Sequence, residues 1–207
     1  MSHEAEEYFE EVSGRWDVLR KSFYGDDVRD AVLNAARVLP EDIVLDVGAG
    51  TGFLTEGAAK IARKVIALDF SEAMTGESRA KLSGRNVEFK IGNVEQIPLP
   101  DGSVDAVIGN MILHHCLNPD ISVKEMARVL APGGRLALSD LQQHNYEFLR
   151  KEHADRWLGF DIPRVRSMLD QAGFADIRVD ALESCCSTTV EHGQVKIPMF
   201  LASGRRR

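Results

Sequence analysis

The residues with the clearest chemical potential lie between positions 44 and 55, where a short apolar run leads directly into three glycines. The run Ile43–Val47 is rich in β-branched residues, as expected for a strand buried on both faces of a parallel sheet. After the glycines, residues 53–63 are predicted to form a helix. A strand, a glycine turn and a helix in this order bring the backbone close to a ligand, because glycine has no Cβ to obstruct it. The loop residues concerned are Gly48, Gly50 and Gly52.

The spacing of these glycines favours one class of cofactor. A dinucleotide-binding loop has the pattern Gly-x-Gly-x-x-Gly, with the pyrophosphate at the helix N-terminus. Here the third glycine comes one residue early, and Phe53 stands where that pattern requires glycine. Asp46 precedes the loop and would repel a pyrophosphate, whereas a cationic amino-acid group suits it. The loop therefore favours S-adenosylmethionine over a nicotinamide dinucleotide.

A second acid ends the next predicted strand, Lys64–Asp69. Asp69 follows Gly52 by 17 residues, near the offset at which an acid meets a ribose in nucleotide-binding βαβ units. Its carboxylate can accept hydrogen bonds from both ribose hydroxyls. The alternative role is to stabilise a helix N-terminus, but Ser71 is already a suitable cap for the helix predicted over 71–82. We therefore expect Asp69 to bind a ribose.

The remaining periodicity alternates strands with helices, which is typical of an α/β fold. Strands are predicted at 87–91, 104–110, 135–141, 175–182 and 195–204, and helices at 5–12, 26–39, 122–130 and 162–172. In open α/β sheets, ligands lie outside the carboxyl ends of the strands. Asn110 ends one of these strands, so we expect it and the residues after it to face the reacting group.

Two motifs carry a family resemblance. The run Asp46-Val-Gly-Ala-Gly-Thr-Gly52 resembles motif I of the class I S-adenosylmethionine-dependent methyltransferases, and residues 128–136 resemble a later signature of the same family. The chain looks like the UbiE-like, type 11 group, and within it is similar to a bacterial subgroup associated with arsenic-repressor-type regulators. The resemblance covers residues 42–204 and implies a Rossmann-like, doubly wound sheet. The implied sheet has seven strands in the order 3-2-1-4-5-7-6, with the last strand antiparallel.

The resemblance also implies a set of cofactor-binding residues. Asn93 stands where the family has an acid on the adenine amino group, and its amide oxygen can still accept that hydrogen bond. The Val94 N–H would meet an adenine ring nitrogen. The full expected set is Asp46, Gly48, Gly50, Gly52, Asp69, Phe70, Met74, Asn93, Val94 and Asn110.

Residues 1–40 precede the methyltransferase domain, which is expected to span 41–207. By analogy with the family, this N-terminal segment is a helical lid over the substrate, with Trp16 and Tyr24 as candidate substrate-binding residues. Simple packing of its aromatic residues against the first strand is the alternative, and both readings can hold together.

An unusually polar block follows the strand at 135–141. Asp140 ends that strand and His144 follows, so we expect both to act in catalysis, with Arg150 and His153 binding the substrate. The alternative is a surface helix with solvated charges. His114 belongs to the pair His114-His115 and is a further candidate base, although such pairs also serve structural or gating roles. We expect no metal.

Three cysteines do not form a disulfide framework. Cys185 and Cys186 are adjacent and could bind a soft metalloid as thiolates, together with Cys116 or His192. The alternative is that they are small buried residues at a strand end.

Composition limits the partners and the location. The net charge is −7 and no basic stripe stands out, so nucleic acid is a poor partner. Residues 205–207 are three arginines, which we interpret as a solvated tail. Without a signal peptide or a membrane-spanning stretch, a cytoplasmic location is expected. The expected partners are a small-molecule methyl acceptor and, as a further hypothesis, a second copy of the chain.

The sequence therefore predicts methyl transfer to a small molecule by in-line displacement, for which proximity and alignment matter most. The acceptors we consider are a quinone-like or phenolic ring, a thiol or trivalent arsenic. An arsenite or thiol methyltransferase that uses Cys185 and Cys186 is one alternative. A non-catalytic S-adenosylmethionine-binding regulatory module is another, and the glycine spacing disfavours a nicotinamide-dependent oxidoreductase.

Overall fold

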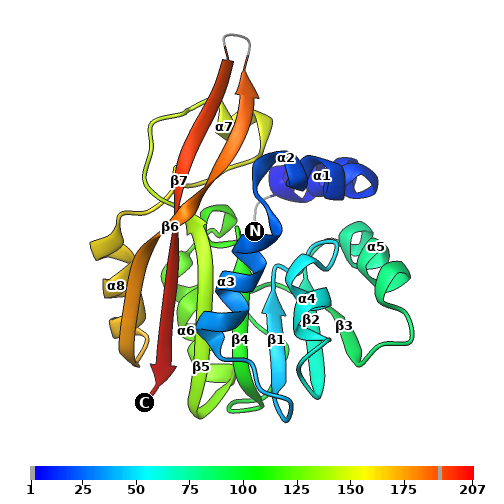
Figure 1. The fold of residues 1–207 in the computed structure, drawn as a ribbon, viewed down its shortest axis with the longest axis vertical. Coiled ribbons are helices and arrows are strands. Elements are labelled where there is room, and N and C mark those ends of the chain that lie inside the picture. The colour runs from blue at the N-terminus through cyan, green and yellow to red at the C-terminus, as the bar shows by residue number, and fades with distance from the viewer. Residues whose placement is uncertain (1–2, 191–192) are drawn as a thin grey trace.

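Seven strands form one sheet in the computed structural model, which describes residues 3–190 and 193–207 (Figure 1). Their order is β3-β2-β1-β4-β5-β7-β6. Strands β1 to β5 are parallel, whereas β7 runs antiparallel to both β5 and β6. The predicted strand order and the antiparallel last strand are confirmed. The strands are β1 (Ile43–Val47), β2 (Lys64–Asp69), β3 (Val87–Ile91), β4 (Val104–Asn110), β5 (Leu130–Leu141), β6 (Phe174–Val190) and β7 (Gly193–Arg206).

Helices cover both faces of the sheet, because neighbouring strand residues point to opposite sides. Val44 packs with α3 (Asp26–Ala36) and α4 (Phe53–Ala58). Leu45 packs on the other face with α6 (Pro119–Val129) and α8 (Ile162–Gln171). A strand that buries both faces must be apolar throughout, which explains the continuous apolar run of β1. The other helical elements are α5 (Glu72–Leu82), α7 (Leu149–Glu152), η1 (Ser13–Arg15) and η2 (Leu113–His115).

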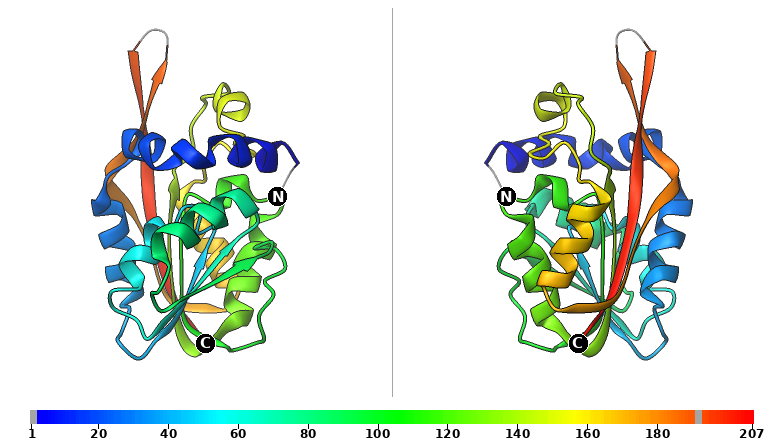
Figure 2. Two further views of the ribbon diagram at one scale, coloured as in Figure 1. Left: turned by 90° about the vertical axis from the view of Figure 1, so that its right-hand side faces the viewer. Right: turned by 90° about the vertical axis from the view of Figure 1, so that its left-hand side faces the viewer.

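The first two helices lie across the end of the sheet (Figure 2). Helix α1 (His3–Val12) buries Phe9 and Val12 in a cluster with Met74 of α5. Helix α2 (Trp16–Phe23) was not predicted, because its aromatic residues lack a clean helical period. Helix α3 packs on the sheet itself, so α1 and α2 alone make up the covering part of residues 1–40. That this part moves as a lid stays a prediction.

Several element boundaries differ from those expected. Helix α3 ends at Ala36 rather than at residue 39, because Arg37 adopts a left-handed conformation with φ of 47°. Helix α4 ends at Ala58, five residues before the expected end. Strands β6 and β7 are longer than predicted and extend beyond the rest of the sheet as a two-stranded arm (Figure 1).

The C-terminal arginines are not a solvated tail. Strand β7 continues to Arg206, which pairs with Phe174 of β6. The Arg206 side chain donates hydrogen bonds to the carbonyls of Arg128 and Leu130, and Arg205 donates to the carbonyl of Gly133 at 3.1 Å. These residues tie the last strand to the end of α6 and the first residues of β5.

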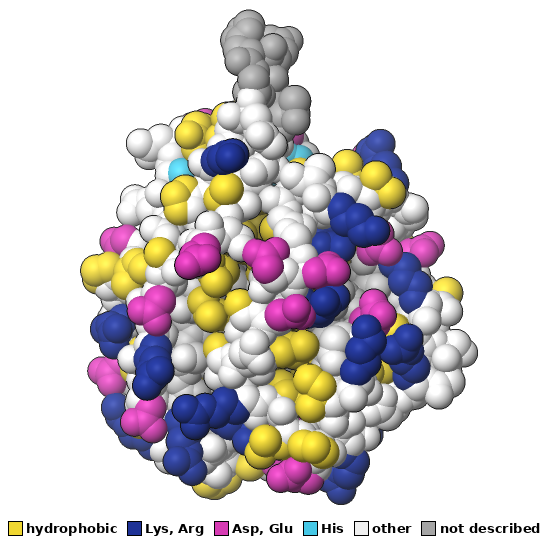
Figure 3. Space-filling view, viewed as in Figure 1, with side chains coloured by type: hydrophobic (Ala, Val, Ile, Leu, Met, Phe, Trp, Pro, Cys, Tyr) yellow, Lys and Arg dark blue, Asp and Glu magenta, His cyan; other side chains and the backbone are white. Residues whose placement is uncertain are grey.

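The visible surface mixes charges of both signs. On the face shown in Figure 3, acidic and basic side chains are interspersed with apolar ones, and no basic stripe crosses it. This face therefore has no continuous basic patch to which a polyanion could bind. Among the residues that the structure describes, no helix has the length and apolar character needed to cross a bilayer.

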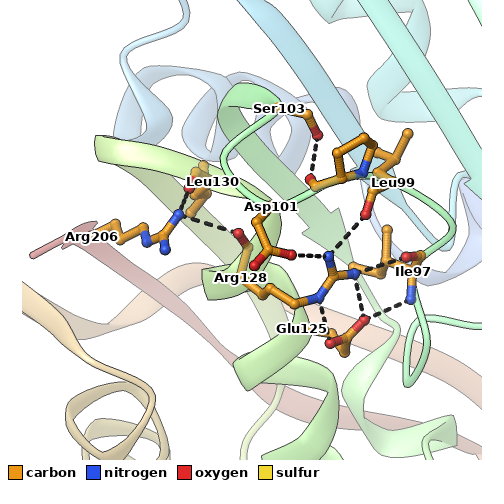
Figure 4. Close-up of polar contacts among 9 residues, drawn as sticks. Ile97, Leu99, Asp101, Ser103, Glu125, Arg128, Leu130 and Arg206 are labelled. Carbon is orange, nitrogen blue, oxygen red and sulfur yellow. Dashed lines mark hydrogen bonds and ion pairs between the residues drawn. The ribbon is translucent and has the colours of Figure 1, made fainter.

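Arg128 of α6 holds the segment that follows β3 (Figure 4). Its guanidinium donates to the carbonyls of Ile97 and Leu99, both at 2.9 Å, and to the carboxylates of Asp101 and Glu125. Glu125 also accepts a hydrogen bond from the Ile97 N–H at 2.9 Å. One cation thus fixes a loop that has no regular secondary structure.

We predict that Arg128→Met lowers the free energy of unfolding by about 2–3 kcal/mol, because several charge-assisted hydrogen bonds are lost together. Arg207→Met is the matched control, since Arg207 pairs with Asp170 in an exposed ion pair that contributes about 0–1 kcal/mol. Urea unfolding of the two variants provides the measurement. Equal losses would show that the Arg128 network is not a stabilising element.

Candidate functional site

A cavity of about 1020 Å³, counted with its open mouth, lies among the glycine loop, the ends of β2, β4 and β5, and helices α1 and α2. The cavity occupies the carboxyl ends of the parallel strands, which is where open α/β sheets bind ligands. Tyr8, Phe9, Trp16 and Phe23 line it from the two covering helices.

The glycine loop adopts left-handed backbone conformations that favour glycine. The φ angles are 66° at Gly48, 53° at Gly50 and 93° at Gly52. A Cβ on Gly48 would lie 2.6 Å from Ile112, whereas the nearest atom to a Cβ on Gly50 would be Nε1 of Trp16, at 3.9 Å. Gly48 and Gly50 line the cavity. Gly52 instead packs against Ser78 of α5 and does not line it.

Asp69 lies at the end of β2 and lines the cavity with Phe70 and Met74. Its carboxylate accepts hydrogen bonds from the Gly50 N–H at 2.7 Å and the Ser71 N–H at 2.9 Å. Burial raises the pKa of Asp69, although these N–H groups oppose the shift. Asp69 therefore shapes the glycine loop in addition to facing the cavity.

Asp46 is 1% exposed and also lines the cavity. The Thr55 hydroxyl donates a hydrogen bond to its carboxylate at 2.6 Å. Burial, together with the nearby charge of Asp69, raises the pKa of Asp46 to about 7. A cationic group bound nearby would favour the ionised form of this carboxyl.

The other expected cofactor residues divide into two groups. Asn110 lines the cavity and accepts a hydrogen bond from Ser139 at 2.7 Å. Asn93 and Val94 do not line it: Asn93 accepts from the Glu95 N–H within a turn, and Val94 is buried in the core. Their assignment to the adenine stays a prediction.

Asp140 is completely buried and does not line the cavity, but it positions a residue that does. Its carboxylate accepts hydrogen bonds from Nδ1 of His114 at 2.6 Å and from the N–H groups of Leu113 and Leu141, both at 2.7 Å. Burial alone would lower the pKa of His114, yet Asp140 and Asp155 raise it to about 9. The neighbouring His115 also lines the cavity, and burial and His114 hold its pKa well below the usual range.

The polar block after β5 is split by the fold. His153 lines the cavity and its Nδ1 is 2.9 Å from the hydroxyl of Tyr8. His144 and Arg150 do not line it. His144 accepts from the Tyr146 N–H at 3.2 Å, and burial lowers its pKa to about 4. Arg150 is exposed and pairs with Glu147. Among the four expected substrate-binding residues, the structure brings Trp16, Tyr24 and His153 to the cavity.

The cysteines do not converge on one site. Cys185 and Cys186 are consecutive in β6, so their side chains point to opposite faces. Cys186 lines the cavity, whereas Cys185 and Cys116 do not. His192, the other hypothesised ligand, lies outside the described residues.

Sequence reasoning missed several cavity residues. Asp155 lies in the polar block, but its sequence position carried no signal that distinguished it from the charged residues around it. Tyr8, Phe9 and Phe23 are aromatic residues on short helices whose orientation depends on packing across the strand ends. Phe53 departs from the dinucleotide-binding pattern, and the structure shows that it also lines the cavity.

Comparisons with known proteins identify the central part of the chain. Residues 45–138 match the family described as a methyltransferase domain. The demethylmenaquinone methyltransferase of Clavibacter sepedonicus is 32% identical over 147 residues, which cover 69% of this chain and 60% of that protein. The arsenite methyltransferase of Halobacterium salinarum is 31% identical over 156 residues, covering 70% of this chain and 40% of that protein.

The structural comparison shows the fold of the chain. A structure solved as a complex between the Haloferax volcanii Trm112 methyltransferase activator and a methyltransferase matches with a TM-score of 0.80 at 20% identity, covering 97% of this chain and 96% of that one. The fold is the Rossmann-like fold of class I methyltransferases. The chain spans 37% of one curated relative it matches and 60% of another. S-adenosylmethionine is the cofactor that the family and fold imply.

The cavity of this chain fits that cofactor. Gly50 lines the cavity and has no Cβ, so a ligand can approach its backbone. The carboxylates of Asp46 and Asp69 lie on the same side, next to the loop, and both line the cavity. An amino-acid ammonium group and a ribose each require an acceptor of this kind.

The raised pKa of Asp46 predicts a pH-dependent stability. Between about pH 4 and pH 7, the folded state keeps a proton that the unfolded state has released. Stability therefore falls as the pH rises through this window, by up to about 1.4 kcal/mol per pH unit. Asp46→Asn removes this titration and keeps the acceptor for Thr55. The difference in the free energy of unfolding, Asp46→Asn minus wild type, should therefore increase as the pH rises from about 4 to about 7 and level off above about pH 7.

Urea unfolding at a series of pH values measures this difference. Asp180→Asn is the control, because Asp180 is exposed on β6. Parallel pH profiles for the wild type and Asp46→Asn would contradict the assignment.

Proposed function

We propose that the protein is an S-adenosylmethionine-dependent methyltransferase whose acceptor is a small aromatic molecule with a hydroxyl group, such as a phenol or a quinol. The observation that carries this proposal is the cavity, which joins a glycine loop with two acids to an enclosed region rich in aromatic rings. The similarity to a demethylmenaquinone methyltransferase supports the same class of acceptor. The resemblance to the arsenic-repressor-associated subgroup stays a hypothesis.

One half of the cavity suits the cofactor. When bound, S-adenosylmethionine supplies a methyl group on a positively charged sulfur. Gly48 and Gly50 allow close approach of the backbone, Asp69 faces the ribose, and Asp46 offers its charge to the amino-acid part. Phe70 and Met74 complete this half with apolar surface.

The other half suits an apolar, flat acceptor. Leu141, Leu149, Cys186 and Ile197 belong to one buried apolar cluster and also line the cavity. The aromatic rings of Phe23 and Tyr24 pack into the same cluster. Aromatic ligands gain from stacked or edge-to-face contacts with such rings, beyond the area that they bury.

Helices α1 and α2 complete the enclosure of this space. Their aromatic side chains are interlocked, with the ring of Phe9 edge-on to Trp16 at 5.5 Å between centroids and to Phe70 at 6.0 Å. Enclosure excludes water from the reacting groups and holds the two substrates in alignment, which is the main requirement for methyl transfer.

Arsenite and thiols remain the second class of acceptor, because an arsenite methyltransferase is among the relatives. A metalloid site of this kind requires Cys185 and Cys186 to act together. Since Cys186 alone of the three cysteines lines the cavity, a site with several thiolates gains no support from the geometry. We therefore rank it below the aromatic acceptor.

A non-catalytic binding module is distinguished by turnover. The proposed function predicts that the protein binds S-adenosylmethionine and converts it to the demethylated product when a phenolic acceptor is present. Binding without product over a panel of phenols, quinols, thiols and arsenite would favour a regulatory module.

We predict that Asp69→Ala weakens S-adenosylmethionine binding by about tenfold or more, because charge-assisted hydrogen bonds contribute about 1.5–3 kcal/mol each. Asp105→Ala is the matched control: Asp105 also accepts a backbone hydrogen bond, from Ile43 at 2.8 Å, but lies outside the cavity lining. Isothermal titration gives both dissociation constants. An unchanged constant in Asp69→Ala would remove Asp69 from the cofactor site.

For the acceptor, we predict that Ile197→Ala lowers kcat/KM for a phenolic acceptor by roughly tenfold, since each apolar contact in such a pocket is worth about 1–3 kcal/mol. The affinity of the Ile197→Ala variant for S-adenosylmethionine should stay unchanged. Ile177→Ala is the control, because Ile177 lies in the neighbouring strand β6, packs against the core and does not line the cavity. Equal effects of the two variants would place the acceptor elsewhere.

A further inference from the structure

Three buried side chains with metal-binding chemistry meet at one wall of the cavity. His114, His115 and Asp155 each offer a ligand atom, and these atoms lie within 4.8 Å of one another. The three residues are 2%, 6% and 5% exposed, and all three line the cavity. A small ion can therefore reach them from the cavity while bulk water is largely excluded.

Both histidines are held by their Nδ1 atoms, which leaves Nε2 available. Nδ1 of His114 lies 2.6 Å from the carboxylate of Asp140. Nδ1 of His115 lies 3.2 Å from the carbonyl of Ala154, and because a carbonyl can only accept, this nitrogen carries the proton. Metal-binding histidines are oriented in this way, by a carboxylate or a carbonyl on the ring nitrogen opposite the metal.

The separation of the ligands also suits a metal. Nε2 of His114 is 3.6 Å from an Asp155 carboxylate oxygen, which is too long for a hydrogen bond. Two ligands of one tetrahedral zinc ion, with bonds of about 2.0–2.2 Å, lie roughly 3.3–3.5 Å apart. The pair is therefore close to the spacing of two ligands of the same ion without any large movement.

The backbone next to this cluster is strained. Ala154, which directly precedes Asp155 and supplies the carbonyl to His115, has a φ of 57°, and Met111, three residues before His114, has a φ of 56°. Left-handed conformations in residues other than glycine cost of order 1 kcal/mol or more, and they concentrate at functional sites. Here they aim the carbonyl and the acid at the two imidazoles.

We propose that His114, His115 and Asp155 form a binding site for one divalent transition-metal ion, with Asp140 as the residue that positions His114. Two imidazoles and one carboxylate are donors suited to zinc and to other ions of the first transition row. Three protein ligands leave at least one coordination position open. That position faces the cavity, so an oxygen or sulfur atom of an acceptor can occupy it.

The charges of the site agree with a divalent ion. Asp140 and Asp155 place two carboxyl groups in the interior, one 0% and the other 5% exposed. Buried carboxylates require compensating positive charge. A divalent ion that displaces the Nε2 proton of His114 would supply the positive charge that balances both groups.

The test uses the full-length protein, stripped with a chelator and then titrated with Zn²⁺ against a chromophoric competitor, and separately with Co²⁺, whose visible absorption reports its ligands. We expect one equivalent of each ion to bind. Asp155→Asn and His115→Gln should each weaken Zn²⁺ binding by at least tenfold and abolish or shift the Co²⁺ bands. Asp140→Asn should weaken binding by about 10–100-fold, as expected for a residue that orients a ligand.

Two controls isolate the site. Asp180→Asn removes an exposed carboxylate, and the double variant Cys185→Ser/Cys186→Ser removes the adjacent thiols; both should bind Zn²⁺ as the wild type does. Zinc should also raise the melting temperature of the wild type. This measurement uses the wild type alone, so it does not depend on whether the buried variants fold.

Absence of stoichiometric binding and of a thermal shift in the wild type would overturn the proposal. Binding that survives in Asp155→Asn and His115→Gln, or that is lost with the cysteines, would overturn it as well. The proposed methyltransferase function is tested separately, because S-adenosylmethionine binding is measured on the metal-free protein.

Discussion

The site depends on a single buried carboxylate, that of Asp140 at the end of β5. With no exposure to solvent, its oxygens can be satisfied only by protein donors, and it accepts hydrogen bonds from two backbone N–H groups and from His114. The N–H of Leu113 belongs to the turn that follows β4, so Asp140 joins the ends of two neighbouring strands. Removing one partner from such a network leaves a buried polar group unsatisfied, which costs more than the hydrogen bond itself contributes. The orientation of His114 is therefore a consequence of the core as much as of the cavity.

The parallel sheet decides where everything else meets. Strands β1, β2, β4 and β5 all end at the same edge, so residues far apart in the sequence, such as Asp46, Asp69 and Asn110, line one cavity. That edge would be open on one side without α1 and α2, whose aromatic side chains fill the gap above it. The same arrangement gives the cavity two chemically different halves. Carboxylates and glycines come from the first two strands, while apolar side chains come from β5 and from the arm formed by β6 and β7.

The predictability of each part follows from how local its signal is. The glycine loop and the position of Asp69 beside it could be predicted because each depends on a short run of residues with a direct steric or hydrogen-bonding cause. The strand order could be predicted because the motifs resemble those of a family with a known fold. The polar block after β5 could not be resolved in the same way. Its backbone is irregular, so no period relates spacing to direction, and the fold turns His153 and Asp155 to the cavity while His144 and Arg150 stay outside its lining. Helix α2 was not predicted for a related reason. Its aromatic residues face a cavity and other helices rather than one flat surface, so they lack the three-to-four-residue spacing of an amphipathic helix.

His114 and His144, both candidate catalytic residues by sequence, have different surroundings in the structure. Both follow a strand that ends at the cavity edge, and both are at least partly buried. His144 has Nε2 buried without a hydrogen-bond partner, and burial, followed by the charges of His114 and Arg150, lowers its pKa to about 4. His114 has a carboxyl group near each ring nitrogen, and its pKa is raised to about 9 in spite of deep burial. The chemistry of this wall of the cavity is thus set by the pair Asp140 and Asp155, and the histidine between them is the group through which it acts.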